Sequence, residues 1–141
     1  MSLLAIDPGK ITGWALFEDS SLCDCGISKT HPPTRVFSKI NVIIEKPKVY
    51  PNRPIDSNDL IELAIRVGRI VEYYSMHGCT VSLVRPSDWK GQLPKDVLWE
   101  RARARLSEKE RAVEAAATAA PSYRHNMRDA IGIGLWKLGR L

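Results

Sequence analysis

The sequence predicts one α/β domain in which helices flank a central mixed sheet. Two apolar runs without polar alternation, residues 3–6 and 42–44, are typical of strands buried on both faces. A helical pattern over residues 58–76 precedes a short strand at 80–84, and this order indicates a crossover to a parallel neighbouring strand. The 141 residues are long enough for one domain with a real core.

The N-terminal third is predicted to be mostly strands. The first strand, residues 2–7, ends at Asp7-Pro8-Gly9, which is a turn signal. Residues 12–17 form its hairpin partner, and residues 22–27 form a weaker strand at the edge. After a proline-containing loop at 31–34, the strand over 41–45 repeats the first pattern and ends in Glu45. We expect the basic, aromatic and proline-broken residues 48–54 to form a loop beside these strand ends.

The remainder is predicted to be mainly helical. Asp56 or Ser57 can cap the helix over 58–76, whose apolar stripe is wider than one sheet-facing side requires. The surplus either meets a partner subunit or is buried on two sides within the monomer. We expect a loop over 85–91 and then three helices. These run from Pro94 to about 106, from Ser107, with Glu110 completing a capping box, to about 120, and from about 123 to 138.

Composition excludes several function classes. No stretch approaches the roughly 18 apolar residues of a membrane span, and no signal peptide is visible, so we expect a cytoplasmic protein without a membrane partner. Three cysteines without a Cys-x-x-Cys motif fit reduced thiols. The net charge of +5 lies in residues 85–141, which contain twelve Lys and Arg residues and seven Asp and Glu residues. This excess indicates a side that faces a polyanion, and a solvated basic helix is the alternative.

Three carboxylates mark the candidate site. Asp7 and Glu45 each end a buried strand, and Asp129 lies on the last predicted helix. Clustered carboxylates repel one another and need a cation, and such hard oxygen ligands suit Mg²⁺ or Mn²⁺. Two such ions can activate a water and stabilise the leaving oxygen of a phosphodiester. The alternatives are that Asp7 caps its own turn and that Asp129 is a surface residue paired with Arg124 or Arg128.

The last helix carries further features beside Asp129. Asn126 and His125 lie three and four positions before it, and such spacings place side chains on one helix face. Gly132 and Gly134 lower helix stability but permit a close backbone approach. We therefore expect this helix to bring Asp129 against the strand ends.

Three motifs in this order resemble the RuvC family of Holliday-junction resolvases, in the ribonuclease H-like superfamily. They are Ile6-Asp7-Pro8-Gly9 with Thr12-Gly13, the strand Ile43-Ile44-Glu45, and the helical segment His125-Asn126-Met127-Arg128-Asp129-Ala130. The resemblance spans nearly the whole chain. The short length and the segment Pro86-Ser87-Asp88-Trp89-Lys90 resemble bacteriophage-type members.

The resemblance implies a ribonuclease H-like mixed five-stranded sheet flanked by helices. It also implies a homodimer that binds four-way DNA junctions and makes paired, symmetric nicks with two Mg²⁺ or Mn²⁺ ions per active site. Asp7, Glu45 and Asp129 match the catalytic, metal-binding acids of the family.

The fourth family ligand, an acid or a histidine one helical turn before the last Asp, is replaced here by Asn126. Three interpretations are open. His125, displaced by one residue, acts as an auxiliary ligand; Asn126 suffices with an altered metal demand; or Asn126 replaces an Asp in an inactivated variant.

The resemblance also implies DNA contacts around the acids. Family members insert an aromatic residue at the junction from the loop after the second acid, and Tyr50, with Arg53 nearby, is the candidate. Packing of Tyr50 under its own loop is the alternative. The candidate phosphate-binding residues lie in loops and on the helix after Pro94; they are Lys10, Lys46, Lys48, Lys90 and Arg101.

Other function classes compete with a junction resolvase. The turn Asp7-Pro8-Gly9 with Thr12-Gly13 also resembles the phosphate-binding turn of actin-like and sugar-kinase phosphotransferases. Those enzymes need two such domains, so we expect no nucleotide cofactor here. Asn126 favours a non-catalytic junction-binding module, and a related nuclease acting on flaps, RNA–DNA hybrids or other branched DNA is a third possibility.

Overall fold

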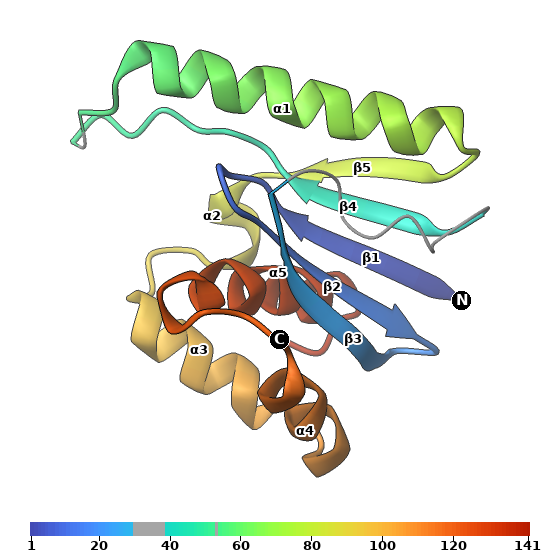
Figure 1. Ribbon diagram of the computed structural model, residues 1–141. Coiled ribbons are helices and arrows are strands. Elements are labelled where there is room, and N and C mark those ends of the chain that lie inside the picture. The colour runs from blue at the N-terminus through green and yellow to red at the C-terminus, as the bar shows by residue number, and fades with distance from the viewer. Residues whose placement is uncertain (30–38, 53) are drawn as a thin grey trace.

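A computed structural model, which describes residues 1–29, 39–52 and 54–141, contains the mixed five-stranded sheet expected from the sequence (Figure 1). The strands are β1 Ser2–Asp7, β2 Thr12–Glu18, β3 Ser21–Ser28, β4 Asn41–Glu45 and β5 Thr80–Val84. Their order is β3-β2-β1-β4-β5. The first three strands pair antiparallel, whereas β4 and β5 run parallel to β1, which confirms the predicted crossover.

Helices cover both faces of this sheet (Figure 1). On one face lies α1 Ser57–Met76, whose first turn is capped because the Asp56 side chain accepts a hydrogen bond of 2.7 Å from the Asn58 N–H. On the other face lie α3 Lys95–Ala104, α4 Glu108–Ala116 and α5 Arg124–Lys137. A short helix, α2 Pro86–Trp89, follows β5, and a 3₁₀ turn at Pro121–Tyr123 precedes α5. None of the described helices is long and apolar enough to cross a membrane.

Two predicted boundaries were wrong. Residues 86–89 form α2 instead of a loop, because Pro86 occupies the first helical position and the Asp88 carboxylate accepts a hydrogen bond of 3.1 Å from the Arg85 N–H. The predicted helix from Ser107 begins with its capping box but ends at Ala116 instead of near 120. The Arg124 guanidinium donates to the carbonyls of Glu114, Ala117 and Ala119, so it satisfies carbonyl groups that the end of the helix leaves without helical partners.

The core between the sheet and α5 depends on a close approach. Met127, Ile131 and Leu135 of α5 are fully buried there. A Cβ atom on Gly134 would lie 2.1 Å from the Phe17 ring of β2, so any larger residue would push the helix outward. The expectation that the α5 glycines let this helix approach the sheet closely is confirmed.

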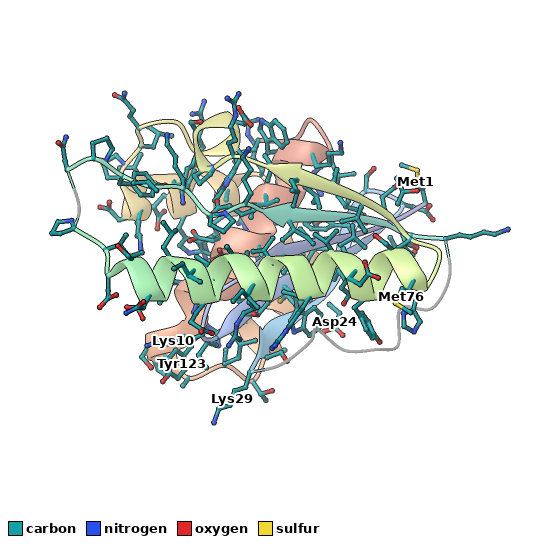
Figure 2. All side chains as sticks on the ribbon, turned by 90° about the horizontal axis from the view of Figure 1, so that it is seen from above. Met1, Lys10, Asp24, Lys29, Met76 and Tyr123 are labelled. Carbon is teal, nitrogen blue, oxygen red and sulfur yellow. The ribbon has the colours of Figure 1, made fainter. Side chains whose placement is uncertain are left out.

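Among the described residues, nothing covers the outer side of α1, which carries exposed apolar side chains beside the charged Arg69 and Glu72. The buried residues of this helix are Val67, Ile70 and Tyr74, whereas Ile61 and Ile65 are 55% and 45% exposed and Met76 is 76% exposed. Figure 2 looks onto this helix, with Met76 labelled near its C-terminal end. A shallow groove of about 500 Å³ runs along residues 65–76. Within the described residues, the prediction that α1 is buried on two sides of the monomer was wrong.

Candidate active site

Two of the candidate acids leave the sheet at the same edge. Asp7 is the last residue of β1 and Glu45 is the last residue of β4. These strands are parallel neighbours with Ile6 opposite Ile44, so both carboxylates follow at the next position. The arrowheads of β1 and β4 in Figure 1 point to this edge, beside α2.

The third acid reaches this edge because α5 touches β2 backbone to backbone. Gly13 of β2 is paired with Asp7. A Cβ atom on Gly13 would lie 2.0 Å from the carbonyl oxygen of Asn126 and 2.6 Å from the Met127 nitrogen. Only a glycine leaves room for α5 here, and Asp129 follows less than one turn later. The Thr12-Gly13 motif thus has a physical role in assembling the three acids.

Electrostatics show that the three carboxylates act on one another. Burial is the largest cause that raises the pKa of Asp7 well above its ordinary value, followed by the negative charges of Glu45 and Asp129. Burial also raises the pKa of Asp129, which the positive charges of Lys90 and Lys95 partly oppose. Three carboxylates that these two lysines compensate only in part attract cations.

The Glu45 carboxylate has two partners from the segment after β5. The indole Nε1–H of Trp89 donates a hydrogen bond of 2.5 Å to Glu45 Oε2, and Lys90 Nζ lies 3.6 Å from the same oxygen. Burial raises the pKa of Glu45, whereas the Lys90 charge and the Trp89 hydrogen bond act in the opposite direction. The side chains of Glu45 and Lys90 are 14% and 25% exposed, so this pair is largely shielded from water.

A groove of about 610 Å³ opens beside the acids. It is lined by Glu45 and Asp129, by residues 50–52 after β4, and by residues 90–95 and Leu98 around the start of α3. Within the described residues, no three His, Cys, Asp or Glu side chains lie close enough together, as they stand, to hold a metal ion.

The predicted DNA-binding residues are only partly gathered at this groove. Lys90 and Tyr50 line it, and Tyr50 is 40% exposed with Lys48 Nζ 5.5 Å from its ring centroid. Lys46 is exposed directly after β4. Lys10 and Arg101 are exposed but are not among the described residues that line the groove, and Arg53 lies outside the described part of the chain.

The residues beside Asp129 differ in exposure. His125 is exposed and its positive form lowers the pKa of Asp129, whereas Asn126 is half-buried. The alternative pairing of Asp129 with Arg124 or Arg128 was wrong. Arg124 and Arg128 instead contact Glu114 of α4, with N–O distances of 3.3 and 3.1 Å.

Sequence reasoning missed two residues of this site. Lys95 is the first residue of α3, and its charge lowers the pKa of both Asp7 and Asp129. A cation is disfavoured at a helix N-terminus, so a lysine there was a signal of another role. Trp89 was quoted only as part of a motif, yet it is 5% exposed and bonded to Glu45. Its signal was its place directly after β5, whose end lies at the same edge as those of β1 and β4.

Comparison with known proteins gives a structural match and no sequence match. No family model and no curated protein matches the chain. A RuvC structure from Thermus thermophilus is similar with a TM-score of 0.56 and 15% identity, over 99% of this chain and 98% of that chain. T. thermophilus RuvC in complex with a Holliday junction substrate is similar with a TM-score of 0.55 and 16% identity, over 99% of this chain and 97% of that chain. The chain therefore has the ribonuclease H-like fold of RuvC over its whole described length.

Proposed function

We propose that the chain is a metal-dependent endonuclease that resolves four-way DNA junctions by paired, symmetric nicks. The observation that carries this proposal is the convergence of Asp7, Glu45 and Asp129, from three separate elements, at one sheet edge beside a lysine-lined groove. The structural similarity to a RuvC that was solved with a Holliday junction substrate supports this choice of substrate. The segment of residues 86–90 favours a bacteriophage-type member, which would act on DNA in the cytoplasm of a bacterium or an infected cell.

The residues of the site fit divalent cations by their chemistry. The donor set is three carboxylates, and burial together with mutual repulsion raises the pKa of Asp7, so a cation would relieve an unfavourable arrangement. Asp7, Glu45 and Asp129 would hold two Mg²⁺ or Mn²⁺ ions. Asn126 would provide a neutral oxygen from the preceding turn of α5, with His125 as an auxiliary ligand. Bound ions of this kind activate a water and stabilise the leaving oxygen of a phosphodiester.

The lysines of the site act on the substrate. Lys90 and Lys95 line the groove beside the acids, where they would bind phosphate oxygens and bring the backbone of the DNA to Asp129. Tyr50, in the segment after β4, also lines the groove, and its ring can stack on an unpaired base at the junction. Lys46 and Lys48 are exposed in the same segment after β4 and would add positive charge near the groove.

A homodimer would use the uncovered side of α1. Ile61, Ile65 and Met76 are exposed apolar residues on this side, with Arg69 and Glu72 between them along the groove, and exposed apolar residues that cluster in this way mark protein interfaces. Gly68 lies in this groove with no atom within 4 Å of its Cβ position, which leaves room for a side chain of a second copy. Ile65→Glu should therefore convert a dimer into a monomer in size-exclusion chromatography with light scattering, and a dimer that persists would place the interface elsewhere.

The function is tested with labelled four-way junctions and a panel of three-way, flap, duplex and RNA–DNA hybrid substrates, each in Mg²⁺, Mn²⁺ or EDTA. We expect paired nicks in the four-way junction with either metal and none in EDTA. Asp7→Asn should abolish cleavage but retain binding, whereas Glu100→Gln, at an exposed position of α3, should leave both unchanged. Preferential cleavage of flaps or hybrids would reassign the substrate, and no metal-dependent cleavage of any branched DNA would reject the proposal.

The second candidate is a non-catalytic junction-binding module, which the uncharged Asn126 favours. The same panel separates the two functions when it includes Asn126→Asp. Tight binding of the four-way junction without cleavage, by both the unsubstituted chain and this variant, would establish the binding module.

A further inference from the structure

Trp89 occupies an unusual place for a large apolar residue, since it links the acid-bearing edge of the sheet to α5. Its ring is 5% exposed and its Nε1–H donates the hydrogen bond of 2.5 Å to Glu45. This bond is neutral, so it fixes Oε2 without cancelling the carboxylate charge, and it leaves Oε1 free of this donor. A buried indole N–H without an acceptor would be unfavourable, so the bond also holds Trp89 in place.

The opposite edge of the Trp89 ring rests on α5. A Cβ atom at Gly132 would lie 2.5 Å from Cζ3 of Trp89 and 3.3 Å from two further ring atoms. Gly132 is three residues after Asp129, so both lie on the same side of α5. The position of this helix therefore affects the positions of two acids, that of Asp129 directly and that of Glu45 through the Trp89 ring.

The backbone of Trp89 is also held in place. This residue is the last of α2, which starts at Pro86 and is closed by the ion pair between Arg85 and Asp88 at 3.0 Å. The backbone of Trp89 is held by α2, and one edge of its ring packs against Gly132. Its indole N–H is directed toward Glu45.

We propose that Trp89 is the positioning residue that orients Glu45 for metal binding, and that Gly132 is the residue of α5 that makes room for it. This inference rests on the proposed metal-dependent function of the same site. Outer hydrogen-bond partners of a metal-binding carboxylate commonly contribute 10- to 100-fold to metal affinity or activity, so a loss on the order of 10- to 100-fold is expected when the N–H is removed.

The first test replaces the donor and keeps most of the packing. Trp89→Phe removes the N–H, and a chain with β-(3-benzothienyl)alanine at position 89 removes it while preserving the two-ring shape. Both should raise the Mn²⁺ concentration needed for half of the metal-induced rise in melting temperature by about 10-fold or more, and both should slow junction cleavage by a similar factor. Junction binding in EDTA should stay at the level of the natural sequence. Trp136→Phe, which removes an indole on the same face of the sheet, is the control and should change none of these quantities.

The second test measures the contact with α5 without any enzyme assay. Gly132→Ala should lower the melting temperature in the natural background, because its methyl group meets the Trp89 ring. In the Trp89→Phe background the same substitution should have a much smaller effect, since the smaller ring leaves that space. Equal losses in the two backgrounds would overturn the role of Gly132.

The outcomes separate this inference from the proposed function. If the natural sequence cuts no branched DNA yet shows Mn²⁺-induced stabilisation that the position-89 variants weaken, the positioning role stands and the nuclease proposal fails. If the natural sequence cuts junctions and both position-89 variants have its Mn²⁺ dependence and cleavage rate, Trp89 is only a packing residue and the inference is rejected.

Discussion

Replacing Glu110 by Gln should lower the free energy of unfolding strongly at pH 7 and only weakly at pH 3. Glu110 is a buried carboxylate on α4, 4% exposed, with four hydrogen-bond donors. Its Oε1 accepts from the Leu22 N–H at 2.8 Å and from Arg140 Nη1 at 2.8 Å. Its Oε2 accepts from the Ser107 N–H at 2.8 Å and from Arg140 Nη2 at 2.9 Å. The carboxylate therefore joins β3, the start of α4 and the C-terminal end of the chain.

The magnitude follows from the protonation equilibrium of this group. The hydrogen bonds from Arg140, and then those from Leu22 and Ser107, outweigh burial and lower the pKa of Glu110 from 4.5 to about 2. This difference corresponds to about 3 kcal/mol of stability at pH 7, which is fully present above the unfolded-state pKa near 4.5. It is lost as the pH falls toward the folded-state value, and about 1 kcal/mol remains at pH 3.

The assay is urea unfolding, followed by tryptophan fluorescence, at several pH values between 7 and 3. Glu110→Gln should be less stable than the natural sequence by about 3 kcal/mol at pH 7, and the gap should narrow to about 1 kcal/mol at pH 3. Glu100→Gln, at an exposed position, should change stability by less than about 0.5 kcal/mol at each pH. A gap that is the same at pH 7 and pH 3 would refute the electrostatic reasoning and would indicate a packing defect.

Three further predictions concern the acids and the groove. Asn126→Asp should increase the rate of Mg²⁺-dependent junction cleavage at least 10-fold because it adds an anionic ligand, and an unchanged rate in single-turnover assays would show that Asn126 is not limiting. Asp7→Asn should raise the melting temperature of the protein in EDTA at pH 7. The folded-state pKa of Asp7 is raised, so its ionisation destabilises the fold as the pH rises above about 4, and a gain that persists below pH 4 would contradict this cause. Four lysines are expected to contact phosphates: Lys46, Lys48, Lys90 and Lys95. Junction affinity, measured by fluorescence anisotropy, should therefore fall roughly 100-fold between 50 and 200 mM salt, and a flat response would argue against these contacts.

The sheet could be predicted from the sequence because its signals are local. The apolar runs of β1 and β4 carry their own pattern, and each ends in a carboxylate that marks the sheet edge. The capping box of Ser107 and Glu110 likewise fixes the start of α4. The end of α4 was missed because the guanidinium that binds its last carbonyls belongs to Arg124, which follows Pro121 and is the first residue of the next helix, α5. No pattern within residues 107–120 contains that information.

The candidate site could be predicted in its acids but not in its other contacts. The strand ends predicted the place of Asp7 and Glu45, and the glycines of the last helix together with the family resemblance predicted that Asp129 joins them. The lysines of the groove were predicted only as loop cations, and Lys95 was missed because its place depends on the path of residues 90–94. Arg101 was predicted near DNA from charge alone, and charge does not specify which side of a helix faces the acids.

The geometry of the site thus depends on how closely one helix lies on the sheet. A glycine inside a helix costs about 1 kcal/mol relative to alanine, and α5 contains two, Gly132 and Gly134. Both stand where a Cβ atom would meet an aromatic ring, and Gly13 stands where it would meet the backbone of α5. The stability lost at these positions is offset only if the helix must come this close, and the residue that requires it is Asp129. Gly134→Ala, whose Cβ would meet the Phe17 ring, should therefore impair metal binding without altering any acid.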